Sequence, residues 1–367
     1  MKLSKNTLNL LNDVESRISA EVEEGYLSQW RDFWSGKCES AIFAPKRKIT
    51  TKPGVELQKI NINDAVEDYD LMLQSQLAKV SDALSNGTSA LGIRANYGTG
   101  IIPSLFGAEI FIMPREQNTL PTVRTFGDDD VIRRIVDSGM PSLDAAFGKK
   151  AFEFGEICLE VFKDYPKISK YVQVYHPDTQ GPLDIAELLW GSEMFYNMYD
   201  EPELVHSFMQ LISDTYTAFL EKWFEMYPNR PDMNVHWDYF MKGNICIRND
   251  SAMNLSPELY SEFAFGYDKK LLAHFGGGMV HFCGRGDHYI DILAGAPDLN
   301  AINLSQPHLN NMDKIYTSLF ENGKKILGLG NSASREYAHR PDATVGMICK
   351  SSAPDESQKE ENAFYKN

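Results

Sequence analysis

The sequence predicts an α/β protein, a (β/α)8 TIM barrel with an N-terminal helical extension. Its 367 residues, 43% of them hydrophobic, suffice for one large core, and barrels of this kind reach several hundred residues as single domains. From about residue 40 onward, short β-prone runs alternate with amphipathic helical stretches, a pattern that predicts parallel strands joined by crossover helices. Eight such runs favour a closed barrel.

The predicted elements divide the chain into three parts. Residues 1–35 form the helical extension, because apolar residues recur three or four positions apart between Leu11 and Val22. Residues 36–349 form the barrel. Residues 350–367 are polar with little apolar content and predict a disordered tail. The predicted barrel strands cover residues 40–44, 90–95, 171–175, 244–248, 279–282, 301–304, 325–329 and 344–348.

Two crossover helices carry clear start signals. Asp200 is the expected N-cap of a helix over 200–224, and Ser256, followed by Pro257, is the expected N-cap of a helix over 256–275. The glycine-containing run 328–331 lacks the third glycine and the lysine of phosphate-binding loops. It therefore predicts a turn, and a dinucleotide site is not supported.

The charge and the cysteines limit the partners and the compartment. There are 36 Lys+Arg against 51 Asp+Glu, a net charge of −15, and no cluster of basic residues reverses it locally. We therefore expect a small-molecule substrate and neither nucleic acid nor a membrane as partner. The N-terminus lacks the apolar core of a secretory signal, and the five scattered cysteines suit reduced thiols, so a cytoplasmic location is expected.

A His-x-Cys pair at the end of a predicted strand is the strongest chemical signal. His281 and Cys283 are two residues apart, so in a strand both side chains point the same way. Imidazole and thiolate suit Zn²⁺, which in catalytic sites takes three protein ligands. Cys349, just past the last predicted strand, is the expected third ligand; were it elsewhere, a carboxylate such as Asp250 would be the alternative. The competing interpretation is a buried thiol and a hydrogen-bonded core histidine.

Other candidates share a position at the carboxyl ends of predicted strands, where barrel enzymes keep their sites. We expect His176, Asp178 and Asp250 to act as catalytic acids or bases. Ordinary turn chemistry is an equally good account of His176 and Asp178. The expected substrate-binding residues are Asn96, Tyr97, Tyr175, Gln180, Asn303 and Gln306.

Four motifs carry a resemblance to a known family: QGPLDIA (180–186) followed by Gly191, YDEPELVH (199–206), LSPE (255–258) and VHFCG (280–284). In this order they resemble the uroporphyrinogen decarboxylase superfamily over roughly residues 90–330. That superfamily consists of (β/α)8 barrels and includes zinc-dependent, corrinoid-linked methyltransferases, to which the HFC motif is closer. The resemblance implies that His281 and Cys283 bind zinc and that a later cysteine, here Cys349, completes the site. The family has a Gly-Cys pair there, whereas this chain has Met347-Ile348-Cys349.

The resemblance implies transfer of a methyl group between a small molecule, either a thiol or a methoxylated compound, and a corrinoid protein. The first alternative is a decarboxylase-like lyase. True decarboxylases carry an arginine-rich segment at the first strand and an aspartate at the second, where this chain has 44–47 (APKR) and 94–97 (RANY). The second alternative, suggested by the atypical C-terminal end, is a barrel that binds a small molecule without catalysis.

Overall fold

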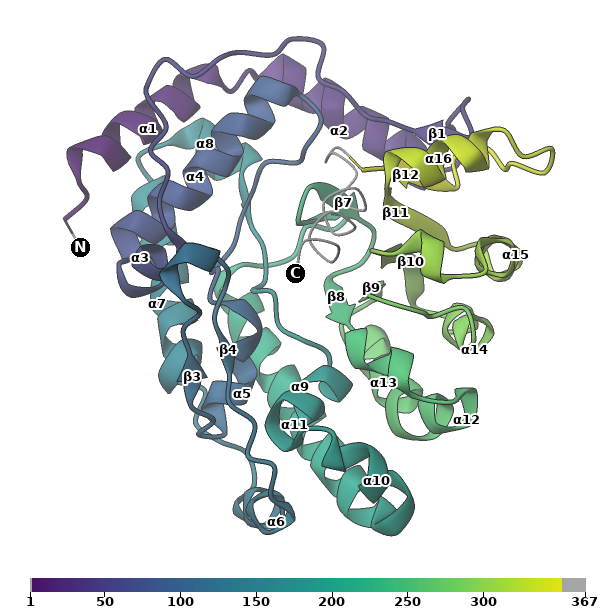
Figure 1. The fold of residues 1–367 in the computed structure, drawn as a ribbon. Coiled ribbons are helices and arrows are strands. Elements are labelled where there is room, and N and C mark those ends of the chain that lie inside the picture. The colour runs from purple at the N-terminus through teal and green to yellow at the C-terminus, as the bar shows by residue number, and fades with distance from the viewer. Residues whose placement is uncertain (1, 352–367) are drawn as a thin grey trace.

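A curved sheet of six parallel strands forms one side of the molecule in this computed structural model, which describes residues 2–351. Helices cover its outer face (Figure 1). Two further strands pair in parallel with each other on the other side, β2 (Gly92–Ile93) and β5 (Gln173–Val174). The strands of the large sheet, in spatial order, are β1 (Ile42–Phe43), β12 (Ile348–Lys350), β11 (Lys325–Leu329), β10 (Leu299–Leu304), β9 (Gly278–Phe282) and β8 (Ile245–Arg248).

The structure is mixed α/β and compatible with a TIM-barrel-like fold, but the strands do not form one closed ladder. Within residues 2–351, β2 and β5 pair with neither β1 nor β8. Among the described residues, the seam beside β8 is bridged by one hydrogen bond between backbone groups, from Gly181 N to the Arg248 carbonyl at 2.7 Å. β1, β2 and β5 are only two residues long, so they offer few groups for further pairing.

A hairpin that the sequence analysis did not predict fills the interior at this seam. It consists of β6 (Asn234–His236) and β7 (Tyr239–Met241), which pair antiparallel. The Ala90 amide donates to the Asp238 carbonyl at 2.9 Å, and the Trp34 indole donates to the Phe240 carbonyl at 2.8 Å. Figure 1 shows β7 inside the arc of the large sheet.

The helices follow the strands as crossover connections, with two corrections to the predicted boundaries. The helix predicted from Asp200 begins after Glu201, because Asp200 still belongs to the preceding helix. The helix predicted from Ser256 does start there, with Ser256 Oγ accepting from the Leu259 amide, but residues Ser261–Phe265 form a π-helical turn.

The helices that follow β1 are α3 (Ile62–Glu67), α4 (Tyr69–Asn86), α5 (Ile101–Leu105), α6 (Asp129–Ser138), α7 (Ala146–Phe162), α8 (Pro166–Tyr171), α9 (Pro182–Trp190), α10 (Glu193–Asp200), α11 (Pro202–Met226), α12 (Pro257–Tyr260), α13 (Gly266–His274), α14 (Ile290–Ala294), α15 (Met312–Glu321) and α16 (Asn331–Ala338). A small hairpin, β3 (Ile110–Phe111) with β4 (Thr122–Val123), follows α5.

The two ends of the chain differ in how they join this core. The first helices are α1 (Lys5–Arg17) and α2 (Ala20–Trp34), and α2 packs Trp30 and Phe33 against Phe43 of β1, with ring centroids 5.0 and 4.5 Å away. No helix among residues 2–351 has the length and apolar character needed to cross a bilayer. Of the predicted tail, residues 352–367 lie outside the described part of the chain, and Lys350 belongs to β12.

Alternation along β9 positions the functional side chains. Val280 and Phe282 pack in the cluster beneath the outer helices, whereas Met279 belongs to the interior cluster. Side chains two apart share a face of a strand, so His281 and then Cys283 follow Met279 along the interior face. The sheet therefore aims the predicted metal ligands into the centre of the molecule.

Candidate metal centre

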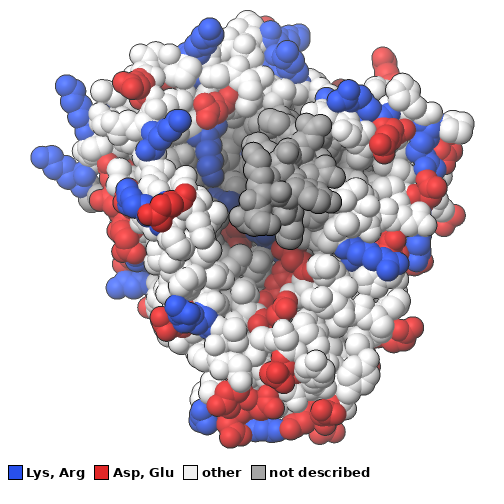
Figure 2. Space-filling view, in the orientation of Figure 1, with Lys and Arg blue, Asp and Glu red and all other residues white. Residues whose placement is uncertain are grey.

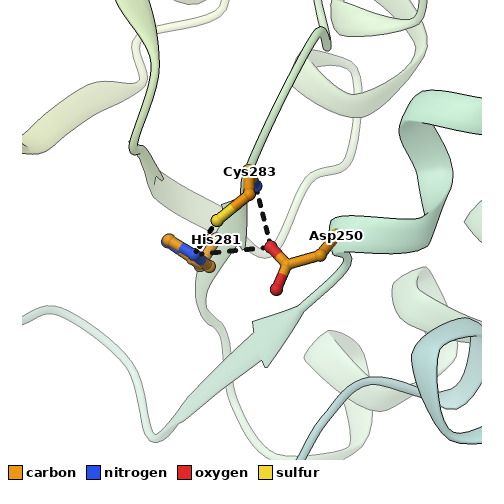
Figure 3. Close-up of side chains that lie close together, drawn as sticks. All are labelled: Asp250, His281 and Cys283. Atoms are coloured by element: carbon orange, nitrogen blue, oxygen red, sulfur yellow. Dashed lines mark hydrogen bonds and ion pairs between the residues drawn. The ribbon is translucent and has the colours of Figure 1, made fainter. Parts of the chain in front are cut away.

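Three side chains converge where β8 and β9 end (Figure 3). Asp250, His281 and Cys283 each offer a ligand atom, and these atoms all lie within 4.8 Å of one another. His281 Nε2 is 3.4 Å from Cys283 Sγ and 3.4 Å from Asp250 Oδ1. A carboxylate from the loop after β8 thus occupies the place that the sequence analysis gave to Cys349.

The protonation of His281 follows from its neighbour Asn303 on β10. Asn303 Nδ2 donates to the Leu327 carbonyl at 2.6 Å, which turns the amide oxygen toward His281. That oxygen lies 2.6 Å from His281 Nδ1 and can only accept. The proton therefore sits on Nδ1, and Nε2 presents its lone pair to Cys283 and Asp250. Metal-binding histidines are oriented by this kind of second hydrogen bond.

The electrostatics of the three donors fit a cation. Burial lowers the pKa of His281, which keeps the imidazole neutral. Burial and the nearby Asp250 carboxylate raise the pKa of the Cys283 thiol to about 11. Three electron-rich atoms therefore face one another, and Asp250 Oδ1 also accepts from the Cys283 amide at 2.7 Å, which fixes the carboxylate. Nitrogen, sulfur and oxygen donors in this number match a catalytic zinc site with an open fourth position.

The three side chains lie beside a large cavity of about 1290 Å³, whose walls include His281, Cys283 and Asn303. Tyr175, the predicted substrate-binding residue after β5, lines the same cavity. Figure 2 shows Lys and Arg scattered among Asp and Glu over this face of the molecule, with both kinds visible on the walls of its central hollow. Catalytic and binding sites commonly occupy such concave sites.

Asp178 lies in the cavity wall and holds two arginines. Its Oδ2 accepts from Arg94 Nη1 at 2.5 Å and from Arg248 Nη1 at 2.8 Å. The two guanidinium groups outweigh the effect of burial and hold the pKa of Asp178 well below its usual range. The predicted acid–base role is therefore unsuited to this carboxylate, which stays ionised and positions Arg94 and Arg248.

Trp237 completes this wall from the tip of the β6–β7 hairpin. Its backbone has a φ of +50°, unusual for a bulky residue. Its indole Nε1 donates to Asp178 Oδ2 at 3.3 Å, and its ring lies edge-on to His281 with centroids 5.0 Å apart. Backbone strain of this kind persists where the surroundings over-determine the conformation, often at functional sites.

Cys349 does not join the metal group. It lies inside β12, is 1% exposed and packs in the interior cluster with Phe43 and Leu327. Strand pairing places Cys349 of β12 level with Leu327 of β11, and His281 lies two strands further on, in β9. Three strand spacings of about 4.8 Å therefore separate Cys349 from His281, which is roughly 14 Å along the sheet. The expected zinc ligand is thus on the correct face but too far around the sheet.

His176 is also placed away from the cavity. Its Nδ1 lies 2.8 Å from the Pro177 carbonyl, and its Nε2 accepts from the Cys246 amide at 3.1 Å. Burial lowers its pKa to about 3. His176 is thus a neutral core histidine with both nitrogens engaged, which fits neither the predicted acid–base role nor simple turn chemistry.

The remaining predicted substrate-binding residues divide into three groups. Asn303 lines the cavity and orients His281, and Asn96 accepts from Arg94 Nε at 2.8 Å. Gln306 accepts from the Gly284 amide at 2.6 Å and so shapes the loop after Cys283. Tyr97 and Gln180 are buried, outside the described lining of the cavity.

Sequence reasoning missed Arg94, Arg248, Trp237 and Lys79, all of which line the cavity. Arg94 and Arg248 lie at the ends of predicted strands, so the positional rule that selected Asn96 and Asp250 could have found them. Trp237 follows a strand that was not predicted, and Lys79 is on a crossover helix, so that rule could not reach either.

The comparisons with known proteins concern the fold. No protein-family model matches the chain, and neither does the sequence of any curated protein. Among solved structures, the chain is similar to a methyltransferase from Methanosarcina mazei, with a TM-score of 0.60 and 13% sequence identity. The likeness covers 92% of this chain and 98% of the other. At this identity the match establishes a methyltransferase-like fold over nearly the whole chain.

Proposed function

We propose that this protein is a zinc-dependent methyltransferase of the uroporphyrinogen decarboxylase superfamily, which transfers a methyl group between a small molecule and a corrinoid carried by a partner protein. The observation that carries the proposal is the convergence of Asp250, His281 and Cys283 at the cavity, with the His281 lone pair directed at the other two. The methyltransferase-like fold and the sequence motifs support it.

The protein's own residues would bind and orient the metal. Asp250, His281 and Cys283 supply three ligands, and Asn303 holds the imidazole in the required tautomer. Zn²⁺ bound there would lower the pKa of a substrate thiol or polarise the oxygen of a methoxy group. The Trp237 ring packs against His281 and limits its movement.

The test combines metal analysis with methyl transfer. The purified protein should contain about one zinc per chain, and it should transfer methyl groups from methylcobalamin to a small thiol. Cys283→Ala should lower the zinc content below one tenth and abolish transfer. Cys349→Ala is the matched control, a cysteine on the same interior face but outside the metal group, and should retain both zinc and activity.

The same measurements separate the alternatives. Absence of zinc from protein prepared without chelators, with equal cobalt or zinc uptake by the parent and Cys283→Ala, would refute the metal centre and leave the lyase or the non-catalytic barrel. One zinc per chain without methyl transfer to thiols would direct the test to methoxylated compounds. Loss of zinc from Cys349→Ala would contradict the assignment of the ligands.

A further inference from the structure

A buried carboxylate of α9 binds the backbone at Asp250. Asp184 is 3% exposed. Its Oδ2 accepts from the Asp250 amide at 3.0 Å, and its Oδ1 accepts from the Ser251 amide at 2.8 Å. Asp184 lies outside the described lining of the cavity and outside the group of three donor side chains. Any influence of Asp184 on a metal therefore passes through the chain segment that carries Asp250.

Asp184 supplies the helix cap that this segment lacks. Residues Asp250–Asn254 form a 3-10 helix, and the first amides of a helix have no acceptor within it. The residue in the N-cap position, Asn249, makes no side-chain hydrogen bond to them. Its side-chain amide donates instead to Asp268 Oδ2 at 2.7 Å. The carboxylate from α9 therefore provides acceptors for the first two amides.

Two further contacts from α9 hold the same segment on either side of the metal ligand. The Gly181 amide at the start of α9 donates to the Arg248 carbonyl at 2.7 Å. A Cβ at Gly181 would lie 2.4 Å from that oxygen, so this close approach requires glycine. Glu187, three residues after Asp184 and on the same side of the helix, accepts from Ser251 Oγ. The backbone is therefore attached to α9 both before and after the ligand.

A fixed backbone directs the Asp250 carboxylate. Its Oδ1 accepts from the Cys283 amide at 2.7 Å and lies 3.4 Å from His281 Nε2, and so short a side chain reaches this place only from a well-placed backbone. Asp184 is also close enough to Asp250 for their negative charges to repel each other. A serine or asparagine would cap the amides without this repulsion, whereas a divalent cation at Asp250 would offset it. The charge of Asp184 therefore suits a metal-bound site better than an empty one.

We infer that Asp184 is a positioning residue of the metal centre, which holds the backbone of Asp250 so that its carboxylate meets the other two donors at the metal. This inference rests on the proposed function, because Asp184 acts through a metal ligand. Removal of a hydrogen bond behind a metal ligand typically weakens metal affinity by about 10- to 100-fold.

The test compares metal affinity with stability in Asp184→Asn. Asparagine keeps the size of the side chain but sets its NH2 group against one of the two backbone amides. The zinc Kd, measured by competition with a chromophoric chelator, should weaken at least about tenfold. The visible d–d bands of the cobalt-substituted protein, which report the arrangement of the ligands, should shift. The free energy of unfolding is measured with urea on the metal-free protein.

Asp68→Asn is the matched control. Asp68 caps α4 in the same way, because its Oδ1 accepts from the Asp70 and Leu71 amides at 2.8 and 3.0 Å, and it lies outside the metal group. This variant should lower the free energy of unfolding, whereas its zinc Kd and its cobalt bands should match those of the parent.

A double-mutant cycle tests whether Asp184 acts through Asp250. Asp250→Ala removes the positioned carboxylate and should itself weaken zinc binding. Adding Asp184→Asn to it should change the zinc Kd by less than about twofold, because no carboxylate is left to position. Should Asp184→Asn fail to fold, Glu187→Ala removes only the acceptor of the Ser251 hydroxyl, and it should weaken zinc binding about threefold in the parent but not in Asp250→Ala.

Two results would overturn the inference while leaving the metal centre in place. One is an unchanged zinc Kd in Asp184→Asn, or in Glu187→Ala where that variant replaces it. The other is an equal loss of affinity in the parent and in Asp250→Ala. A parent that binds no zinc would overturn the metal centre together with this inference, which is a distinct result.

Discussion

The hydrogen bond between Asn303 and His281 makes a specific prediction about metal affinity. Replacing Asn303 with leucine, which has nearly the same size, removes the acceptor of the His281 Nδ1 proton and the donor to the Leu327 carbonyl. The imidazole then loses its fixed tautomer. Loss of such a second hydrogen bond weakens metal affinity by about 10- to 100-fold, which corresponds to roughly 1.4 to 2.8 kcal/mol.

The same substitution should lower the stability of the metal-free protein. Leu327 is fully buried, and its carbonyl loses a donor at 2.6 Å. A buried acceptor left unsatisfied costs about 1 to 3 kcal/mol. Zinc affinity is measured by competition with a chromophoric chelator at fixed pH, and the free energy of unfolding is measured with urea on the metal-free protein.

Asn303→Asp separates the two effects. An aspartate keeps an oxygen to accept from His281 Nδ1 but sets its other oxygen against the Leu327 carbonyl, so stability should fall while the zinc Kd stays within about threefold of the parent. Gly328 gives Asn303 its space: at φ +75°, a Cβ there would lie 2.6 Å from Asn303 Nδ2. If Asn303→Leu binds zinc like the parent, or Asn303→Asp loses affinity as severely as Asn303→Leu, the argument from the tautomer is wrong.

Three further predictions concern residues whose roles the structure changed or sharpened. Cys349→Ser should leave the zinc Kd within about twofold of the parent, because Cys349 lies outside the metal group. It should lower the free energy of unfolding by about 1 to 3 kcal/mol, because the new hydroxyl is buried. A zinc affinity weakened tenfold or more would show that Cys349 belongs to the site. Zinc binding at pH 7.5 should release about one proton, since the metal-free Cys283 thiol has a pKa of about 11 and must ionise to bind. Calorimetry in buffers of different ionisation enthalpy counts the released protons. Zero release would contradict Cys283 as a ligand. His176 has a pKa of about 3 in the native state, against an ordinary value of 6.5. Between these two pH values only the unfolded state binds a proton on this imidazole. The stability present above pH 6.5 is therefore lost as the pH falls toward 3. His176→Gln should therefore reduce the pH slope of unfolding free energy below pH 6.5 by up to about 1.4 kcal/mol per unit, and an unchanged slope in urea titrations would show that His176 does not titrate as described.

The strands of the large sheet were predictable because parallel strands buried on both faces appear as short apolar runs. The predicted strands 279–282 and 301–304 differ from β9 and β10 only at their first residues. His281 and Cys283 followed directly, since a two-residue spacing at the end of a strand puts both side chains on one face. Local pattern and local geometry were sufficient for this part of the site.

The third ligand depended on information that local patterns do not contain. The last strand was predicted over 344–348, which put Cys349 beyond its end, but β12 runs over Ile348–Lys350. Cys349 therefore sits inside the strand, paired with Leu327. The predicted barrel already made the strand 244–248 a neighbour of 279–282, but local patterns did not show that a residue of the last strand lies three strands away from His281.

The hairpin that carries Trp237 gave no recognisable signal. Two-residue hairpin turns are usually marked by glycine, asparagine or aspartate where φ is positive. Here that position holds a tryptophan, between His236 and Asp238. The contacts of its indole with Asp178 and His281 compensate for the backbone strain, so the turn exists because of the tertiary site it serves and cannot be recognised from the residues that form it.

Asp178 and Asp250 show why residue type and position at a strand end do not determine a chemical role. Both are carboxylates after predicted strands, and both were expected to act as acids or bases. Asp178 faces two guanidinium groups that hold its pKa far below neutrality, so it remains an anion that fixes Arg94 and Arg248. Asp250 shares one of these cations, since Arg248 Nη2 lies 3.5 Å from its Oδ2, but its Oδ1 faces a neutral imidazole nitrogen and the backbone amide of Cys283. Asp178 is therefore enclosed by cations of the chain, whereas Asp250 keeps one oxygen directed at His281 and Cys283, where a metal ion could bind.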